Sequence, residues 1–387
     1  MEAFWPTVSD IEKERRHKNI RLLMEKRGIE CLIIAGSSGN YNEKSGELRY
    51  ISNNVVYYGE GFAIFPLNPN IEPLVLLWSP TQAWWAERKA WFPAKYTGYP
   101  YYPDILAYIK NVGLEKARIG LVREDCFPGP VYKGLLEGLP QGEFESFTDE
   151  MTRLRLVKSE EELSFQEKAA HLADLAYEAM VNTARPGVRE YEVWAAIEDA
   201  MLRNGADGPD FNLICSGPSP IFPTLPASHR TLDKGDIILT ELSPSYGGYW
   251  VQFCRPVALG QPDKEFEKLY EAVLEAYKLG VSMLKPGLSP KDINDAITQL
   301  IESKGLVSLV YANVSEKGIH MTNASDSVQA ALLSEMAIEP GMTFVNHPSA
   351  ANPQKTKGML IGDMFVVTKD GPRNLNKSPL KLTVVDV

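Results

Sequence analysis

With 387 residues, 44% of them hydrophobic, the chain is too long for one ordinary domain and can bury a sizeable core, which predicts two globular domains. Its net charge is −10, and its lysines and arginines form no run, so we expect no nucleic-acid partner. The sequence contains no stretch of about 18 apolar residues, so we expect no membrane span.

The first half of the chain alternates predicted helices with short apolar strands. A charged amphipathic helix over residues 10–27 ends at Gly28, a residue suited to the left-handed backbone found at helix C-termini. The next predicted elements are strands at 30–35, 62–65 and 73–78, a helix at 103–112 and a strand at 118–122. This alternation over about 150 residues is typical of an α/β layer domain.

A boundary near residues 146–159 leads into the second half, so we expect domains over 1–153 and 154–387. Ser159 and Glu162 form a predicted capping box at the start of a helix over about 160–183. Further predicted helices cover about 190–204, 265–284 and 289–304, with strands between them. The second domain is therefore expected to be α+β, with sheets covered by helices.

One predicted hairpin carries most of the candidate chemistry. Residues 237–242 form an apolar strand, and 249–255 form its return strand after a loop rich in Ser, Pro and Gly. If the hairpin is centred between Tyr246 and Gly247, Glu241 and Gln252 lie opposite each other, with Cβ atoms roughly 5 Å apart. Two carboxylates there would bridge a metal pair, whereas Gln brings no charge to balance two cations.

The cysteines and the N-terminal residues bear on the cellular compartment of the protein. The four cysteines show no paired spacing, which predicts reduced thiols in place of disulfides or a zinc site. They are Cys31, Cys126, Cys215 and Cys254. Residues 1–6 lack the basic region and apolar stretch of a signal peptide, so we predict a cytoplasmic protein.

Five segments, in this order and spacing, resemble the pita-bread family, which contains creatinase, aminopeptidase P, prolidase and methionine aminopeptidase. They are residues 48–51, 154–163, 235–255, 340–342 and 366–371. Each segment is a weak signal alone, but together they cover nearly the whole chain. The resemblance implies a creatinase-like α/β N-terminal domain, an α+β pita-bread catalytic domain and a homodimer.

The chain departs from this family at its metal-binding positions. The metallopeptidase members use two Asp, one His and two Glu. Glu241 and Gln252 stand at the Asp positions, His347 and Gly362 at the Glu positions, and Ser327 at the His position. The chain therefore resembles a metal-ligand-deficient, creatinase-like member, and we predict neither a metal nor another cofactor.

Glu241 and His347 form the predicted catalytic pair, because a His that titrates near neutrality beside a carboxylate can act as acid and base. His320 is a third catalytic candidate, since residues 318–323 correspond to the family's Gly-His-Gly segment. Structural roles remain open for each: an ion pair between Glu241 and Arg255, a hydrogen-bonded core His347, and a loop position for His320. Predicted substrate contacts are Gln252, Arg255, Tyr249 and Arg49.

These residues predict a metal-independent hydrolase that cleaves a carbon–nitrogen bond in a small polar molecule. Without a metal, the pKa of water stays far above neutrality, so the substrate must be activated by protonation, strain or electron deficiency. An amidine, a cyclic amide or a strained ring meets that condition. Three alternatives stay open: a non-catalytic small-molecule-binding protein, a metal-free lyase, and a mononuclear metallohydrolase rebuilt from His347, His320 and Glu241.

Overall fold

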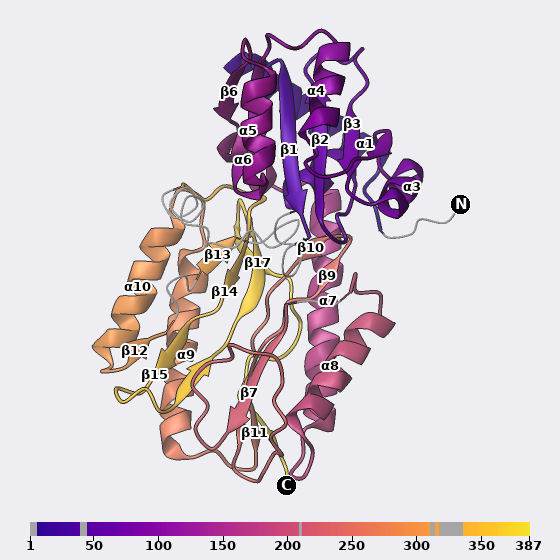
Figure 1. Ribbon diagram of the computed structural model, residues 1–387. Helices are drawn as coiled ribbons and strands as arrows, with labels where there is room; N and C mark the ends of the chain where they lie inside the picture. The colour runs from indigo at the N-terminus through magenta and orange to yellow at the C-terminus, as the bar shows by residue number, and fades with distance from the viewer. Residues whose placement is uncertain (1–5, 39–44, 209–210, 310–313, 317–335) are drawn as a thin grey trace. The chain divides into compact units, whose positions relative to one another are not determined.

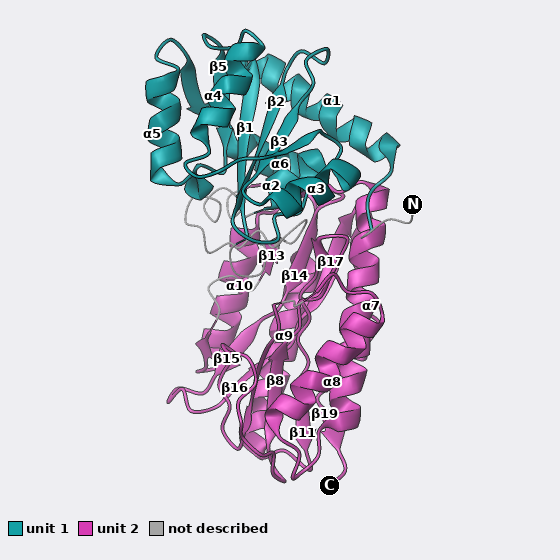
Figure 2. Ribbon diagram, turned by 45° about the vertical axis from the view of Figure 1, so that its right-hand side comes forward, with its two compact units in different colours: residues 1–155, 319–322 teal, residues 156–318, 323–387 magenta. Residues whose placement is uncertain are grey.

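The computed structural model describes residues 6–38, 45–208, 211–309, 314–316 and 336–387. The chain divides into two compact units at Arg155 and Leu156, which Figure 2 colours separately. The predicted domain boundary after residue 153 lies two residues before this division. Within the described ranges, no helix is long and apolar enough to cross a membrane.

Unit 1 is built on a mixed six-stranded sheet in the order β4-β3-β2-β1-β5-β6. Central β1 runs antiparallel to β2 and parallel to β5, so both hairpin and crossover connections occur. The strands are β1 (Cys31–Ser37), β2 (Glu60–Pro66), β3 (Leu74–Leu77), β4 (Ala94–Tyr96), β5 (Arg118–Val122) and β6 (Glu143–Ser146). The helices around them are α1 (Asp10–Arg27), α2 (Gly46–Ser52), α3 (Pro80–Lys89), α4 (Tyr102–Asn111), α5 (Gly129–Gly138) and α6 (Thr148–Leu156).

Local sequence sets the ends of α1. The Ser9 side chain accepts a hydrogen bond from the backbone N–H of Glu12, which caps the first turn. Gly28 ends the helix with φ 68°, the left-handed conformation that glycine adopts without strain. Ile20 and Met24, one turn apart, are fully buried and hold the helix to its unit.

Unit 2 has two pairs of helices, and each pair packs on its own apolar cluster. The long α7 (Glu160–Thr183) and α8 (Glu190–Arg203) contribute to one cluster, and α9 (Lys264–Met283) and α10 (Pro290–Ser303) to the other. The pairs are visible on different sides of the strands in Figure 1. The capping box expected at Ser159 and Glu162 is present at the start of α7.

The strands of unit 2 form several short sheets. One four-stranded sheet has the order β19-β11-β8-β7, and another has the order β13-β14-β17-β18. A backbone bridge between Cys254 and Gly362 links strands of the two sheets. The strands are β7 (Leu213–Gly217), β8 (Ile237–Glu241), β9 (Ser245–Tyr246), β10 (Tyr249–Trp250), β11 (Val257–Leu259), β12 (Val307–Ser308), β13 (Val314–Glu316), β14 (Thr343–Asn346), β15 (Ser349–Ala351), β16 (Gly358–Leu360), β17 (Asp363–Thr368), β18 (Gly371–Asn374) and β19 (Thr383–Val385).

The register of the hairpin differs from the prediction. Tyr246 pairs with Tyr249, and the same register continues through the bridge between Leu242 and Phe253 to β8 and β11. The turn is therefore Gly247-Gly248, where both residues have positive φ, as a two-residue type I′ turn requires. The predicted centre was one residue too early, which moves every cross-strand partner by two residues.

Candidate functional site

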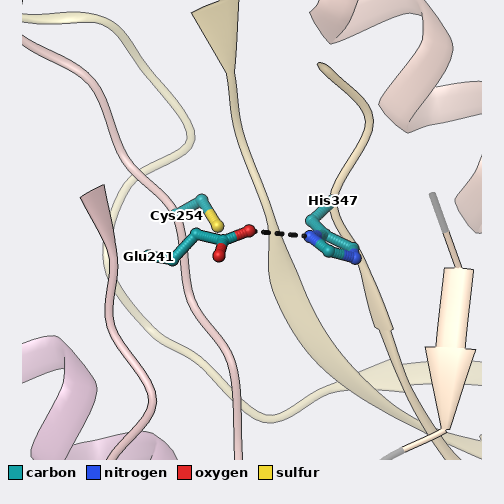
Figure 3. A group of neighbouring side chains, drawn as sticks. All are labelled: Glu241, Cys254 and His347. Carbon is teal, nitrogen blue, oxygen red and sulfur yellow. Dashed lines mark ion pairs between the residues drawn. The ribbon is translucent and has the colours of Figure 1, made fainter. Parts of the chain in front are cut away.

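Three buried side chains of unit 2 meet where its strands join. Glu241 ends β8, Cys254 lies directly opposite it in the corrected register, and His347 follows β14. Each offers one ligand atom, and these atoms all lie within 4.8 Å of one another (Figure 3). Glu241 and His347 are each 5% exposed, and Cys254 is fully buried.

Backbone pairing brings His347 to the other two residues. The N–H and C=O groups of Cys254 and Gly362 exchange hydrogen bonds of 2.9 Å in each direction. The β14–β17 ladder, continued by one residue, places Gly362 opposite His347. A Cβ atom on Gly362 would lie only 2.5 Å from the Cβ of His347. The absence of a side chain at position 362 therefore lets the two strands approach this closely beside the site.

The polar atoms of His347 are poorly satisfied. Its Nδ1 lies 3.5 Å from Oε1 of Glu241, and neither ring nitrogen has a hydrogen-bond partner among the residues that the structure describes. A buried polar atom without a partner costs roughly 1–3 kcal/mol. Imidazole, thiolate and carboxylate are the ligands that Zn²⁺ and related ions prefer, so the three residues fit a single metal ion.

The same residues do not fit the two-ion cluster implied by the family resemblance. Gln252 is neutral and faces Ser243, not Glu241, and Gly362 has no side chain. Neither residue supplies the negative charge that would balance a second cation.

The side chain of Arg255 is held in structural hydrogen bonds, whereas we predicted that it contacts substrate. Its guanidinium donates to Asp363 Oδ1 at 2.7 Å and to four backbone carbonyls, so all five N–H donors are used. Tyr277 and Asn374 donate to the other oxygen of Asp363. Burial, reinforced by this carboxylate, raises the pKa of the Tyr277 hydroxyl, which keeps it a donor. The alternative ion pair between Arg255 and Glu241 is replaced by this network.

The other residues predicted to belong to the site differ in their surroundings. The Tyr249 hydroxyl donates to Glu162 at 2.7 Å inside the core, which gives it a packing role in place of substrate binding. Arg49 is buried in α2 of unit 1, and its substrate role stays a prediction. His320 lies outside the described residues. Cys254 was interpreted only as a reduced thiol, although the Gly247-Gly248 pair was a sequence signal for the register that places it opposite Glu241.

A separate hollow of about 360 Å³ lies along one face of α1. Its lining residues all come from that one helix: Glu14, His17, Lys18, Arg21, Leu22 and Glu25. It contains none of the residues around Glu241. A hollow formed by a single helix face brings no chemistry together from separate elements, so we place the candidate site at Glu241, Cys254 and His347.

Comparison with known proteins identifies the architecture and then the family. The prolidase from Pyrococcus horikoshii OT3 superposes with a TM-score of 0.80 at 24% identity, over 95% of this chain and 99% of that one. The X-Pro aminopeptidase from Thermotoga maritima gives 0.82 at 20% identity, over 95% and 99%. The molecule thus has the two-domain pita-bread architecture. Residues 165–369 match metallopeptidase family M24 and residues 16–157 match the creatinase/prolidase N-terminal domain, so the chain belongs to metallopeptidase family M24.

Curated relatives agree with this family. The uncharacterized peptidase YqhT of Bacillus subtilis is 30% identical over 278 residues, which cover 72% of this chain and 77% of that protein. The Xaa-Pro dipeptidase of Pyrococcus horikoshii is 26% identical over 375 residues, which cover 96% and 99%. These relatives support the prediction that the chain is a hydrolase.

The comparisons contradict the predicted metal-independent hydrolysis of a non-peptide bond. The family is one of metallopeptidases, and the relatives are named as dipeptidases and peptidases. The prediction equated the loss of the family's ligand set with the loss of metal chemistry. It missed that Cys254 stands beside Glu241 and His347. The predicted homodimer and cytoplasmic location stay predictions.

Proposed function

We propose that this protein is a metal-dependent peptidase that hydrolyses an amide bond in short peptides, with one ion held by Glu241, Cys254 and His347. The observation that carries the proposal is the convergence of these three ligand atoms within 4.8 Å, from three separate strand segments. Membership of a metallopeptidase family and the names of the relatives support peptide substrates.

The composition of the site favours a particular kind of ion. Three protein ligands leave a fourth position open, as in catalytic zinc sites. Thiolate and imidazole favour Zn²⁺ over harder ions such as Mg²⁺ or Mn²⁺, which prefer oxygen. When bound, such an ion supplies Lewis acidity that activates water and polarises an amide carbonyl.

The chain's own residues define the rest of the chemistry. Glu241 has two carboxylate oxygens, so one can ligate an ion while the other accepts a proton from water. Glu241 and His347 are each 5% exposed, and Gln252 is 4% exposed. With so little surface open, a small substrate such as a dipeptide suits this site better than a long peptide.

Metal titration tests the proposal. The protein is purified with a thiol reductant and without an affinity metal, stripped with chelator, and titrated with Zn²⁺, Co²⁺ and Mn²⁺. We expect one Zn²⁺ per chain, a sulfur-to-cobalt charge-transfer band with Co²⁺, and dipeptide hydrolysis that chelator abolishes.

Substitution of each ligand should weaken binding roughly 100-fold, since three or four ligands share the binding energy. The variants are Glu241→Gln, Cys254→Ser and His347→Ala. Cys215→Ser and the exposed His229→Ala are matched controls that should bind Zn²⁺ like the unsubstituted chain. Two ions per chain, or full binding by Cys254→Ser, would show that the proposed site is wrong. Hydrolysis that persists in chelator would reject the metal-dependent mechanism.

A further inference from the structure

A second pair of buried polar side chains lies next to the proposed metal site. The hairpin register places Ser243 opposite Gln252, two residues along from the pair formed by Glu241 and Cys254. Because side chains alternate between faces every residue, all four lie on one face of the hairpin. The other face carries Leu242, Val251 and Phe253, which belong to an apolar cluster, and is thus excluded as a polar site.

Ser243 and Gln252 each bury an oxygen that has no hydrogen-bond partner within the described part of the chain. These atoms are Oγ of Ser243, which is fully buried, and Oε1 of Gln252, which is 4% exposed as a residue. Each unpaired buried oxygen costs roughly 1–3 kcal/mol. Native proteins leave few such groups, and those that they keep call for an explanation such as a ligand.

The position of Ser243 is fixed by hydrogen bonds behind it. Its backbone N–H donates to Oδ1 of Asn212 at 3.0 Å, and the amide of Asn212 in turn donates to Glu198 at 2.7 Å. Ser243 and Asn212 are both buried. A side chain that is held rigidly by its backbone, yet has an unpaired hydroxyl, is suited to bind a ligand group in a defined direction.

We propose that Ser243 and Gln252 bind a secondary amide of the substrate. Gln252 Oε1 accepts the amide N–H, and the Ser243 hydroxyl donates to the amide carbonyl. Gln252 Oε1 can only accept, and the hydroxyl can donate, so together they match a group with one donor and one acceptor. Neither side chain is charged, so a neutral group suits them better than an ion. The inference deepens the proposed peptidase function and rests on it for the identity of the substrate.

This arrangement predicts a substrate preference that differs from the one stated in the names of several relatives. A peptide bond before proline has no N–H, because the ring occupies the nitrogen. With such a substrate Gln252 Oε1 would stay buried and unpaired. The chain should therefore favour dipeptides whose peptide bond carries an N–H over Xaa-Pro dipeptides, although several relatives are named Xaa-Pro dipeptidase.

The test compares dipeptides that share their first residue and end in alanine, N-methylalanine or proline. With the zinc-loaded protein we expect kcat/KM to be about 10- to 100-fold higher for alanine than for the other two, the range set by one buried hydrogen bond. Gln252→Ala should bring the three values close together, mainly by lowering the value for alanine. Ser243→Ala should lower the value for all three substrates, because each has the carbonyl.

Metal content separates this inference from the metal site, since Gln252→Ala and Ser243→Ala should each retain one Zn²⁺. The exposed Gln261→Ala and Ser282→Ala are matched controls that should keep the preference. Binding of the same peptides in the presence of chelator is measured by calorimetry, because it needs no turnover. If no dipeptide is cleaved, but the one ending in alanine still binds better than the one ending in N-methylalanine, the peptidase proposal fails and the amide subsite stands. Equal binding and equal turnover, or a preference for proline, would overturn the subsite.

Discussion

Gly362 has a larger effect on the site than its lack of a side chain suggests. The resemblance to the pita-bread family implies a Glu at this position and another at His347. In this structure the backbone leaves no room for a side chain at 362, because a Cβ there would lie 2.5 Å from the Cβ of His347. Together the two departures from the family pattern exchange two carboxylates for a single imidazole.

Substitution of Gly362 by alanine tests this close packing. The new methyl group would also lie 3.0 Å from Cα of His347 and 3.2 Å from the Asn346 carbonyl, so backbone must move. We expect the free energy of unfolding to fall by about 1–3 kcal/mol, typical of overpacking, and Zn²⁺ affinity to fall with it. Denaturant unfolding and metal titration measure both. Gly129→Ala is the control, because a Cβ there meets nothing within 4 Å. Unchanged Zn²⁺ affinity in Gly362→Ala would show that His347 does not depend on this space.

Sequence reasoning named some site residues and missed others for identifiable reasons. Glu241 and His347 stand at family positions within recognisable strands, so position alone marked them. Arg255 was assigned to substrate because its partner, Asp363, lies 108 positions further along the chain. No local pattern signals such a pairing. Cys254 was missed because its role depends on hairpin register.

At the level of elements, the hairpin from Glu241 to Cys254 determines which side chains share a face. Its turn is held from outside: the carboxylate of Asp207 accepts the backbone N–H groups of both Gly247 and Gly248. Since a change of register would separate Glu241 from Cys254, this contact also supports the site.

Removal of the Asp207 carboxylate should weaken both the turn and the metal site. We expect Asp207→Ala to lower the free energy of unfolding by about 1 kcal/mol, the contribution of a typical hydrogen bond at the surface. Zn²⁺ affinity should fall as the hairpin loosens. Asp199→Ala, which removes an exposed i,i+4 ion pair with Arg203, is the control and should change stability by less than about 0.5 kcal/mol. If Asp207→Ala matches that control in both measurements, the turn contact has no bearing on the site.

Long helices with an exposed face were easier to predict from the sequence than short, buried ones. The predicted helix at 160–183 has the bounds of α7, because a long amphipathic pattern and a capping box mark it. The short α2 was not predicted: all seven of its residues are buried, so it shows no alternation of apolar and polar faces. The return strand expected over 249–255 is regular only at β10, since its pairing depends on strands far away in sequence.

At the scale of the whole molecule, stability should depend on pH through a half-buried histidine of unit 1, His17. The Nε2 of His17 lies 2.8 Å from the Ile51 carbonyl, and its ring contacts Phe65. Burial, together with the nearby cations Lys13, Arg16 and Arg21, lowers the pKa of His17 from 6.5 to about 4.

This shift destabilises the protein in mild acid. Below pH 6.5 the unfolded chain takes up a proton at His17 that the folded chain refuses until about pH 4. The free energy of unfolding should therefore fall as pH decreases through this window, by roughly 3 kcal/mol in total from this group. Denaturant titrations at pH 7, 5.5 and 4 would show the loss. His17→Phe should have a shallower pH dependence, and the exposed His171→Asn should not. Equal slopes in His17→Phe and the unsubstituted chain would refute the assignment.

The division of the chain and its family were accessible from sequence, whereas its chemistry was not. Ordered short motifs along the whole chain identified the pita-bread architecture, because each reflects a local turn or strand end. The predicted metal-independent chemistry is contradicted by the metallopeptidase family and the names of the relatives. The group formed by Glu241, Cys254 and His347 could not be predicted, since it depends on which side chains meet across strands.

The contact between Gly362 and His347 also limits how the site can be redesigned. A Glu introduced at 362 would bring its Cβ within 2.5 Å of the Cβ at 347, and every residue except glycine has a Cβ there. On this backbone a second carboxylate therefore cannot be added by one substitution, because the two strands would first have to move apart. The distance between two strands thus decides whether a side chain at 362 can take part in the site.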